Sequence, residues 1–316
     1  MHISKVLLGK VFLEDSARQF MSICPVCLEK MLDLGMVSQH MSREASVGDE
    51  KHVAWLHRNI SSTRISPPEL RRELERFLRV ESDLKSWFIS RFIHRFFSNP
   101  PHPFIAKMQK PTKEVIAGYA IEHHHFLKQW VKSCSYILAK TDSEEVEKYE
   151  LENILTEYYG KDGKPSHHEL LIKMGISVGL TRKQILTSRP LQKTADAIKL
   201  WKNVAENLDW LLILSAMHPL ELIASSSIRE YGAEFGYFNP AILRDNSITP
   251  EAVNFLFEGY SLDVSHSKDA LDIISVHADS PNVREECQEV FLASINAFDM
   301  YLDARLDRGL LLEGKL

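Results

Sequence analysis

The sequence predicts an all-α protein, a bundle of about seven helices with a helical N-terminal extension. Apolar residues recur at helical spacing along nearly the whole chain, and no convincing strand pattern appears. Gly and Pro are scarce, with 13 of each among 316 residues, which argues against a fold built on many tight turns. The hydrophobic fraction of 44% and the charged fraction of 26% are those of an ordinary globular chain that can bury a sizeable core.

The N-terminal extension is predicted to cover residues 1–66, and the bundle residues 67–316. Residues 16–31 form the first expected helix, with Cys24 and Cys27 on its apolar stripe. The rest of the extension is polar and mixed, and it ends in a cluster of Ser, Thr and Pro that is typical of a connecting segment.

Start and stop signals place the helices of the bundle. Pro67 and Pro68 begin a long helix near Glu69, and the segment SNPPHP at residues 98–103 ends it. Later starts are marked by a capping box at Ser166 and by a Pro at the first helical position after Thr249. In order, we expect helices over residues 112–140, 143–159 and 167–176, a short one after Thr181, then 193–235 (bent or broken at Pro219), 250–277 and 282–308, with a loop over 236–248.

Composition limits the class of protein. Four cysteines are too few for a disulfide framework and fit a reducing compartment. The net charge of −5 gives no general reason to expect nucleic acid as a partner. The most apolar stretch, Leu208–Met217, is about half as long as a bilayer span, and the N-terminal apolar run lacks a signal-peptide cleavage site. We therefore expect a cytoplasmic protein that binds neither nucleic acid nor membrane.

The Cys24-Pro-Val-Cys27 pair is interpreted as two buried or idle thiols. It lies in a helical pattern rather than after the strand of a thioredoxin-like unit. Cys134 and Cys287 do not form a second pair that would complete a zinc site.

Two acid-x-x-His pairs lie within predicted bundle helices. They are Glu122 with His125 and Asp263 with His266, and side chains three residues apart share a helix face and can hold one cation together. With 14 His and 43 acidic residues, chance alone predicts about two such pairs, so the spacing carries little weight by itself. Their position in bundle helices matters more, because di-iron sites of helical bundles are built from such pairs.

Three segments at these residues resemble one family in the same order along the chain. They are EHHHFLKQWVKSCSYILAK, LENILTEYYGKDGKPSHHELLIKMGISVGLTRKQI and FLFEGYSLDVSHSKDALDII. They resemble the ligand helices of the heme-oxygenase-like di-iron oxidases, which are non-heme relatives of the TenA- and PqqC-type helical bundles. The resemblance extends from about residue 70 to 310 and implies a heme-oxygenase-like fold for the bundle.

The resemblance also implies a set of metal ligands. Glu122 and His125 would come from the first ligand helix, and Asp263 and His266 from the third. Glu157 is the expected carboxylate of the second helix, with Glu221 or Glu230 as alternatives because Glu157 is far from the third helix in sequence. In the family pattern His-x-x-x-Asp-x-x-His, the first His falls on Gly259. Glycine offers no ligand, and the adjacent Glu258 could replace it only if the helix were distorted.

The implied function is that of an O2-dependent non-heme iron oxidase or oxygenase. Two Fe(II) ions would bind O2, form a peroxo-di-ferric species and oxidise a small amino-acid-like or carboxylate substrate in natural-product biosynthesis. Gly259 leaves one or two ions as the expected content. Arg91, Arg95 and Arg244 could each clamp a substrate carboxylate, but a surface or capping role is favoured for each.

The alternative is a bundle of the TenA or PqqC type without metal. It would bind a small heterocycle in the same cavity, or act as an interaction module through residues 1–66. The expected partner is a small-molecule substrate, and the protein is also expected to be able to form a homodimer.

Overall fold

The computed structural model describes residues 24, 26, 27, 29, 31–60, 65–78, 84–160, 163–244 and 248–315. At Leu34, Arg58, 75–78 and 260–267 it describes the backbone only. Every element in this part of the chain is a helix, as predicted. Across the same residues, no helix combines the length and the apolar character that a membrane span requires.

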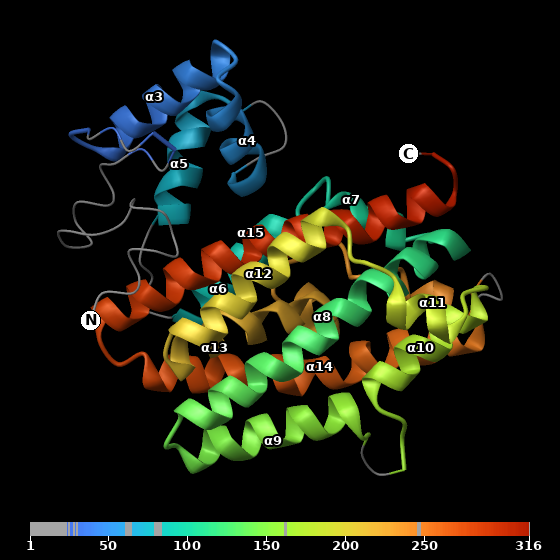
Figure 1. The fold of residues 1–316 in the computed structure, drawn as a ribbon. Coiled ribbons are helices and arrows are strands. Elements are labelled where there is room, and N and C mark those ends of the chain that lie inside the picture. Colours follow the sequence, from blue (N-terminus) through green and yellow to red (C-terminus); the bar gives the residue numbers. More distant parts are fainter. Residues whose placement is uncertain are drawn as a thin grey trace. The chain divides into compact units, whose positions relative to one another are not determined.

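The chain forms two compact units, Met1–Arg95 and Phe96–Leu316. The helices of the first unit are α3 (Leu34–Ser46), α4 (Glu50–Asn59), α5 (Pro67–Leu78) and α6 (Leu84–Phe96), which reaches the boundary (Figure 1). The predicted division after residue 66 remains a proposal.

Asp residues begin the first two helices of this unit. The side chain of Asp33 accepts a hydrogen bond from the backbone N–H of Met36, and that of Asp49 accepts one from His52. The sequence analysis described this segment only as polar and mixed. The two caps show that it forms two separate helices. The predicted helix over residues 16–31 is wrong in its described part, because Val26 and Cys27 lie in a turn; residues 16–23 lie outside the described residues.

The second unit contains the predicted bundle helices that follow α6 (Figure 1). Its α-helices are α7 (Pro103–Met108), α8 (Lys113–Lys140), α9 (Glu144–Tyr158), α10 (His167–Ser177), α11 (Arg182–Thr187), α12 (Gln192–Asn207), α13 (Trp210–Met217), α14 (Pro250–His277) and α15 (Pro281–Leu312). Three short 3-10 helices are η1 (His218–Ile223), η2 (Ser226–Arg229) and η3 (Pro240–Arg244).

One long helix predicted over residues 193–235 is in fact four elements, α12, α13, η1 and η2. Leu208 has extended backbone angles and ends α12, and Asp209 caps α13 by accepting a hydrogen bond from Leu212 N–H. Pro219 then sits in the first turn of η1, where its missing N–H costs nothing. The predicted helix from Glu69 to residue 97 likewise divides into α5 and α6, and residues 79–83 between them lie outside the described residues.

The long helices α8 and α15 pack with their backbones in direct contact. A Cβ on Gly118 of α8 would lie 2.8 Å from the carbonyl oxygen of Arg305 and 2.9 Å from the Cα of Gly309. A Cβ on Gly309 would lie 2.8 Å from the Cα of Val115. The two glycines therefore allow an approach that no larger residue permits, and they set the spacing of the helices that carry much of the pocket described below.

Candidate functional site

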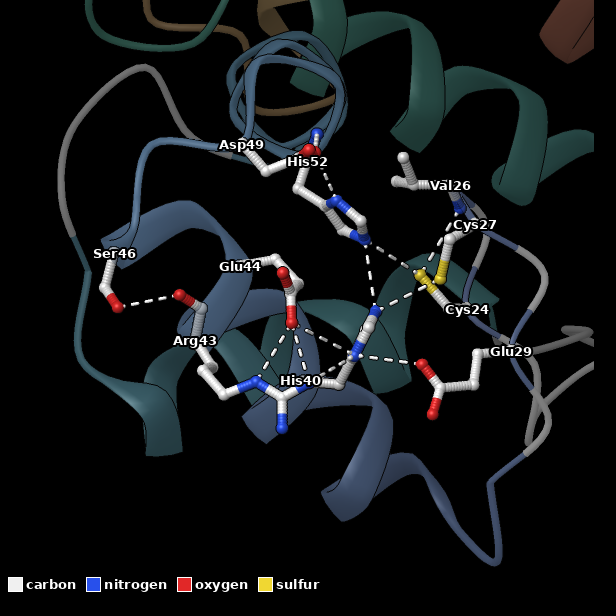
Figure 2. A network of polar contacts seen from close by, with 10 residues as sticks. All are labelled: Cys24, Val26, Cys27, Glu29, His40, Arg43, Glu44, Ser46, Asp49 and His52. Carbon is white, nitrogen blue, oxygen red and sulfur yellow. Dashed lines mark hydrogen bonds and ion pairs between the residues drawn. The ribbon is translucent and has the colours of Figure 1, made fainter.

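Four metal-type ligands meet in the first unit (Figure 2). The thiols of Cys24 and Cys27 and the imidazoles of His40 and His52 place ligand atoms within 4.8 Å of one another. The Sγ of Cys24 is 3.4 Å from Nε2 of His52, and the Sγ of Cys27 is 3.2 Å from Nε2 of His40. The two Nε2 atoms are 3.1 Å apart, so both rings direct the same nitrogen into one cluster.

The local fold explains this arrangement. The two cysteines lie at either side of a turn before α3, His40 lies on α3, and His52 lies in the first turn of α4. Asp49 Oδ1 lies 2.6 Å from Nδ1 of His52 and also accepts the backbone N–H of that residue. The carboxylate thus holds the ring with Nε2 directed into the cluster, and carboxylates commonly orient metal-binding histidines in this way. Burial raises the pKa of the Cys24 thiol to about 11, so forming the thiolate costs free energy here. A bound cation would offset that cost.

The chemistry of these donors fits zinc. Two sulfurs and two imidazole nitrogens form the Cys2His2 set of a closed structural zinc site. The spacing Cys-x2-Cys-x12-His also follows the zinc-finger pattern as far as His40. The second histidine follows after 11 residues instead of three to five, because it comes from another helix. Sequence reasoning therefore missed the site, and the geometry favours a metal site over the idle thiols that we predicted.

The second unit contains a pocket with an empty volume of about 720 Å³. Its walls come from α8, α9, α10, η1, α14 and α15 and from residues near Tyr237. The lining is mainly apolar and aromatic, and its polar members are Tyr119, His123, Glu157, His167, Glu221, Tyr237 and Arg305.

Glu157, His167 and Glu221 bring nitrogen and oxygen donors into this pocket. Oε1 of Glu157 lies 2.8 Å from Nδ1 of His167. A neutral imidazole that donates from Nδ1 to this carboxylate would leave the lone pair of Nε2 for a cation. Oε2 of Glu157 is buried and has no hydrogen-bond partner among the described residues. A cation at this wall would satisfy that oxygen.

The comparisons with known proteins identify the bundle. The profile of the TENA/THI-4/PQQC family matches residues 89–308. The chain belongs to this family. The predicted relationship to TenA- and PqqC-type bundles is therefore confirmed, at the level of the family. A second profile, described as C2H2 type zinc-finger (1 copy), matches residues 21–79, the segment that contains the Cys2His2 cluster. A search of curated proteins gives no significant match.

Solved structures confirm the heme-oxygenase-like fold of this TENA/THI-4/PQQC chain. One is a domain of unknown function with a heme oxygenase-like fold from Shewanella denitrificans, with TM-score 0.53, 16% identity, and coverage of 72% of this chain and 93% of that one. A TenA homolog from Pseudomonas syringae has TM-score 0.53, 12% identity, and coverage of 74% and 92%. A CADD-like protein of unknown function from Nostoc punctiforme has TM-score 0.51, 16% identity, and coverage of 72% and 94%.

Within this TENA/THI-4/PQQC bundle, the predicted ligands fall in different places. Glu157 and Glu221 line the pocket, as does Gly259. Asp263 and His266 follow Gly259 by four and seven residues in α14, and their side chains lie outside the described residues.

The first-helix pair, Glu122 and His125, is not part of the pocket lining. Glu122 is fully buried, and its carboxylate accepts hydrogen bonds from Nε of Arg308 at 2.8 Å and from the backbone N–H of Leu191 at 3.2 Å. Burial lowers the pKa of His125, which also hydrogen-bonds the backbone of Ser188. A ligand role for this pair stays a prediction, and it would require Glu122 to give up Arg308.

The two remaining alternatives, Glu258 and Glu230, are not part of the pocket lining. Glu258 accepts hydrogen bonds from Nζ of Lys164 at 3.0 and 3.1 Å. Glu230 is exposed and is not part of the lining.

The pocket residues that sequence reasoning missed are His123, His167 and Arg305. His123 directly precedes two histidines on α8, and nothing in the spacing says which of the three faces a cavity. His167 follows the Ser166 cap and was interpreted as the start of a helix, which it also is. Only packing shows that both rings enter the pocket.

A further buried polar group lies in the bundle. The side chains of Cys134, Glu150 and His218 are almost or fully buried and place ligand-type atoms within 4.8 Å of one another. Nε2 of His218 lies 3.0 Å from Oε1 of Glu150, and its Nδ1 lies 3.0 Å from the hydroxyl of Tyr149. Burial raises the pKa of the Cys134 thiol well above its usual value, and the Glu150 carboxylate adds to the effect.

Proposed function

We propose that the pocket of the second unit is the active site of an O2-dependent iron oxidase that acts on a small carboxylate or amino-acid-like substrate. The observation that carries the proposal is the grouping of Glu157, His167 and Glu221 on the wall of a pocket whose lining is mainly apolar and aromatic. Carboxylate and imidazole donors suit non-heme iron, and iron held by such donors can supply O2 chemistry.

The donor set fits iron on three counts. Glu157 has one buried carboxylate oxygen without a hydrogen bond among the described residues. A neutral His167 that donates from Nδ1 to that carboxylate would offer the lone pair of Nε2. The family pattern adds Asp263 and His266 from α14, and we assign to His167 the imidazole that Gly259 lacks.

In this proposal, different residues of the chain would bind the iron, exclude water and pack the helices. Glu157, His167 and Glu221, with Asp263 and His266, would hold the iron, which when bound supplies the activation of O2 for substrate oxidation. The aromatic and aliphatic lining excludes water and leaves room for a small substrate. Glu122 and His125 would serve the packing of α8 against α15 and the 188–191 segment.

An anaerobic Fe(II) titration of the full chain tests this assignment. We expect one or two irons per chain, lost or strongly weakened in His167→Ala and Glu157→Gln, and retained in the matched variant His125→Ala. Iron lost in His125→Ala but retained in His167→Ala would instead support the ligand set predicted from the resemblance. No iron in any preparation would contradict the oxidase.

A metal-free small-molecule site is the second candidate for the pocket. Gly259 and the aromatic lining of Tyr119, Phe126, Trp130, Phe255 and Phe298 favour it, because flat heterocycles stack on such rings. Relatives of this fold include proteins named a TenA homolog and a TenA family transcription regulator. Tight binding of an aminopyrimidine to iron-free protein, abolished in Phe255→Ala, would support this alternative.

We further propose that the first unit is a structural zinc module. Cys24, Cys27, His40 and His52 would hold one Zn²⁺, as the geometry in Figure 2 and the zinc-finger match suggest. Metal analysis should find about one zinc per chain, lost in Cys27→Ser and kept in Cys287→Ser. Equal zinc in both variants would contradict the module.

A further inference from the structure

Arg305 is a buried cation in the wall of the pocket. It lies on α15 and is 1% exposed. One terminal nitrogen donates to the hydroxyl of Tyr237 at 2.7 Å. The other donates to the hydroxyl of Tyr301 at 2.5 Å and lies 2.7 Å from Nδ1 of His123. The guanidinium carbon lies 4.2 Å from the centre of the Tyr119 ring, so aromatic faces cover the group.

None of these partners carries a negative charge. Burial raises the pKa of both tyrosine hydroxyls, Tyr237 and Tyr301, so they stay protonated. Burial, and then the charge of Arg305, lowers the pKa of His123 well below its usual value, so this ring stays neutral. In the described part of the chain no carboxylate lies within ion-pair distance of Arg305. Its Nε is buried and has no hydrogen-bond partner there.

The neighbouring arginine on α15 shows what is missing. Arg308, three residues later, donates from Nε to the buried carboxylate of Glu122 at 2.8 Å. A guanidinium does not lose its proton in proteins, so a buried arginine needs a counter-charge or its burial is costly. Arg308 has one, and Arg305 has none among the residues that the structure describes.

We propose that Arg305 is the anchor for an anionic ligand in the pocket, a monocarboxylate with an apolar body. The guanidinium would hold the carboxylate, and the tyrosines and His123 would fix the orientation of the guanidinium. The inference deepens the proposed function by naming the residue that recognises the substrate, but the binding itself needs neither iron nor O2.

The rest of the pocket decides between a carboxylate and a phosphate. Arg305 is the one permanently charged cation in the described lining, and Glu157 and Glu221 line the same pocket. A dianion would be repelled by these carboxylates and would find too few donors, whereas a monoanion needs one guanidinium. The remaining lining is largely aromatic and aliphatic, for example Phe126, Trp130 and Phe255, which suits an aryl or alkyl body.

Calorimetric binding to the full chain, purified without added iron, tests the proposal. The probes are 3-phenylpropionate, its neutral amide, acetate and inorganic phosphate. We expect 3-phenylpropionate to bind roughly 10- to 100-fold more tightly than the amide, because a hydrogen bond to a charged group is lost in the amide. Acetate and phosphate should bind more weakly than 3-phenylpropionate.

Variants assign the preference to Arg305. In Arg305→Met the preference for the carboxylate over the amide should vanish, and Arg305→Lys should keep part of it. Arg182→Met, which removes an exposed arginine of α11, should behave like the unaltered protein. A preference that survives in Arg305→Met, an unaltered protein that binds acid and amide equally, or tighter binding of phosphate would each overturn the proposal.

The iron-oxidase proposal and the Arg305 anion-site proposal can be refuted independently of each other. Because the binding experiment adds no iron, an iron-free result in the titration would refute the oxidase and leave the anion site standing. If Arg305→Met does not fold, the comparison of acid and amide with the unaltered protein and with Arg305→Lys still decides the matter.

Discussion

At the scale of single residues, the four cysteines differ in their surroundings. Cys27 is exposed in the cluster of the first unit, whereas Cys134 and Cys287 are buried in the bundle. Burial raises the pKa of Cys134 well above its usual value and that of Cys287 to about 12, so neither forms a reactive thiolate at neutral pH.

These differences predict an order of labelling by a thiol reagent. The zinc-loaded protein should react slowly, chelation should expose Cys24 and Cys27, and Cys134 and Cys287 should react only after denaturation. Mass spectrometry of labelled peptides checks the order, and in Cys27→Ser, which lacks one zinc ligand, Cys24 should react without chelation. Rapid labelling of Cys134 in native protein would contradict this account of the bundle.

His124 and His168 form a second residue-scale feature, a pair with Nδ1 and Nε2 2.9 Å apart. Burial, then the charges of His125 and His168, lowers the pKa of His124 to about 4, below the value of 6.5 for an unperturbed histidine. Between these values the unfolded chain binds more protons than the folded one, so stability falls as the pH drops from 6.5 towards 4.

Replacing His124 should therefore flatten the pH dependence of unfolding. Between pH 7 and pH 5 the loss of stability due to this ring is about 2 kcal/mol. We expect His124→Gln to lose less stability over this interval, and the exposed control His57→Gln to behave like the unaltered protein. Thermal unfolding at the two pH values measures it. An identical pH slope in His124→Gln would show that the ring is not held neutral.

Prediction from sequence succeeded unevenly among these residues. Glu157 and Glu221 were selected from the sequence and do line the pocket. Arg305 could not be found, because the sequence around a buried arginine looks the same as that around a surface arginine until its spatial neighbours are known. Spacing also favoured His125 over His123 on α8, although packing turns His123 to the pocket. Helix rotation within a bundle is set by neighbouring helices, which local patterns do not describe.

At the scale of elements, the crossing of α8 and α15 depends on the absence of two side chains. A methyl group on Gly118 would meet backbone atoms of Arg305 and Gly309, which cannot rotate away. We expect Gly118→Ala to destabilise the bundle by about 2–3 kcal/mol, even though alanine is the better helix former.

This loss should lower the melting temperature by roughly 5–10 °C. Gly236→Ala is the matched control, because the nearest atom to its added methyl is the carbonyl oxygen of Phe238 at an ordinary 3.4 Å. Calorimetry compares the two variants. Equal melting temperatures would mean that the helices separate at little cost.

The same scale shows why most helices could be predicted and one could not. The caps at Thr112, Ser166 and Thr249 are local signals, and each precedes a helix close to its predicted start. The break after α12 was missed because the apolar period continues through Leu208, while the cap at Asp209 was overlooked. The spacing of apolar residues shows which residues are buried in each helix. It does not show that the chain changes direction between the two helices.

At the scale of the whole molecule, the two units should depend on metal differently. The described core of the first unit includes Val37, Met41 and Leu70, and the proposed structural zinc site would add folding free energy to this unit. Removal of zinc should therefore raise hydrogen exchange in α3 and α4 and leave α8 and α15 unchanged. Exchange that rises equally in α8 would contradict the independence of the bundle from zinc.

Asp49 has two roles, and together they restrict which residues can replace it. The start of an ordinary helix accepts Ser, Thr, Asn or Asp almost interchangeably, since each can bind the free N–H groups. Here one carboxylate oxygen accepts the backbone N–H of His52 and also lies against the Nδ1 of its ring. A mutation to Ser or Thr would still begin the helix yet would leave the imidazole free to turn. A protein with such a substitution would keep all four ligand residues and both helices, and it would still bind the proposed zinc more weakly.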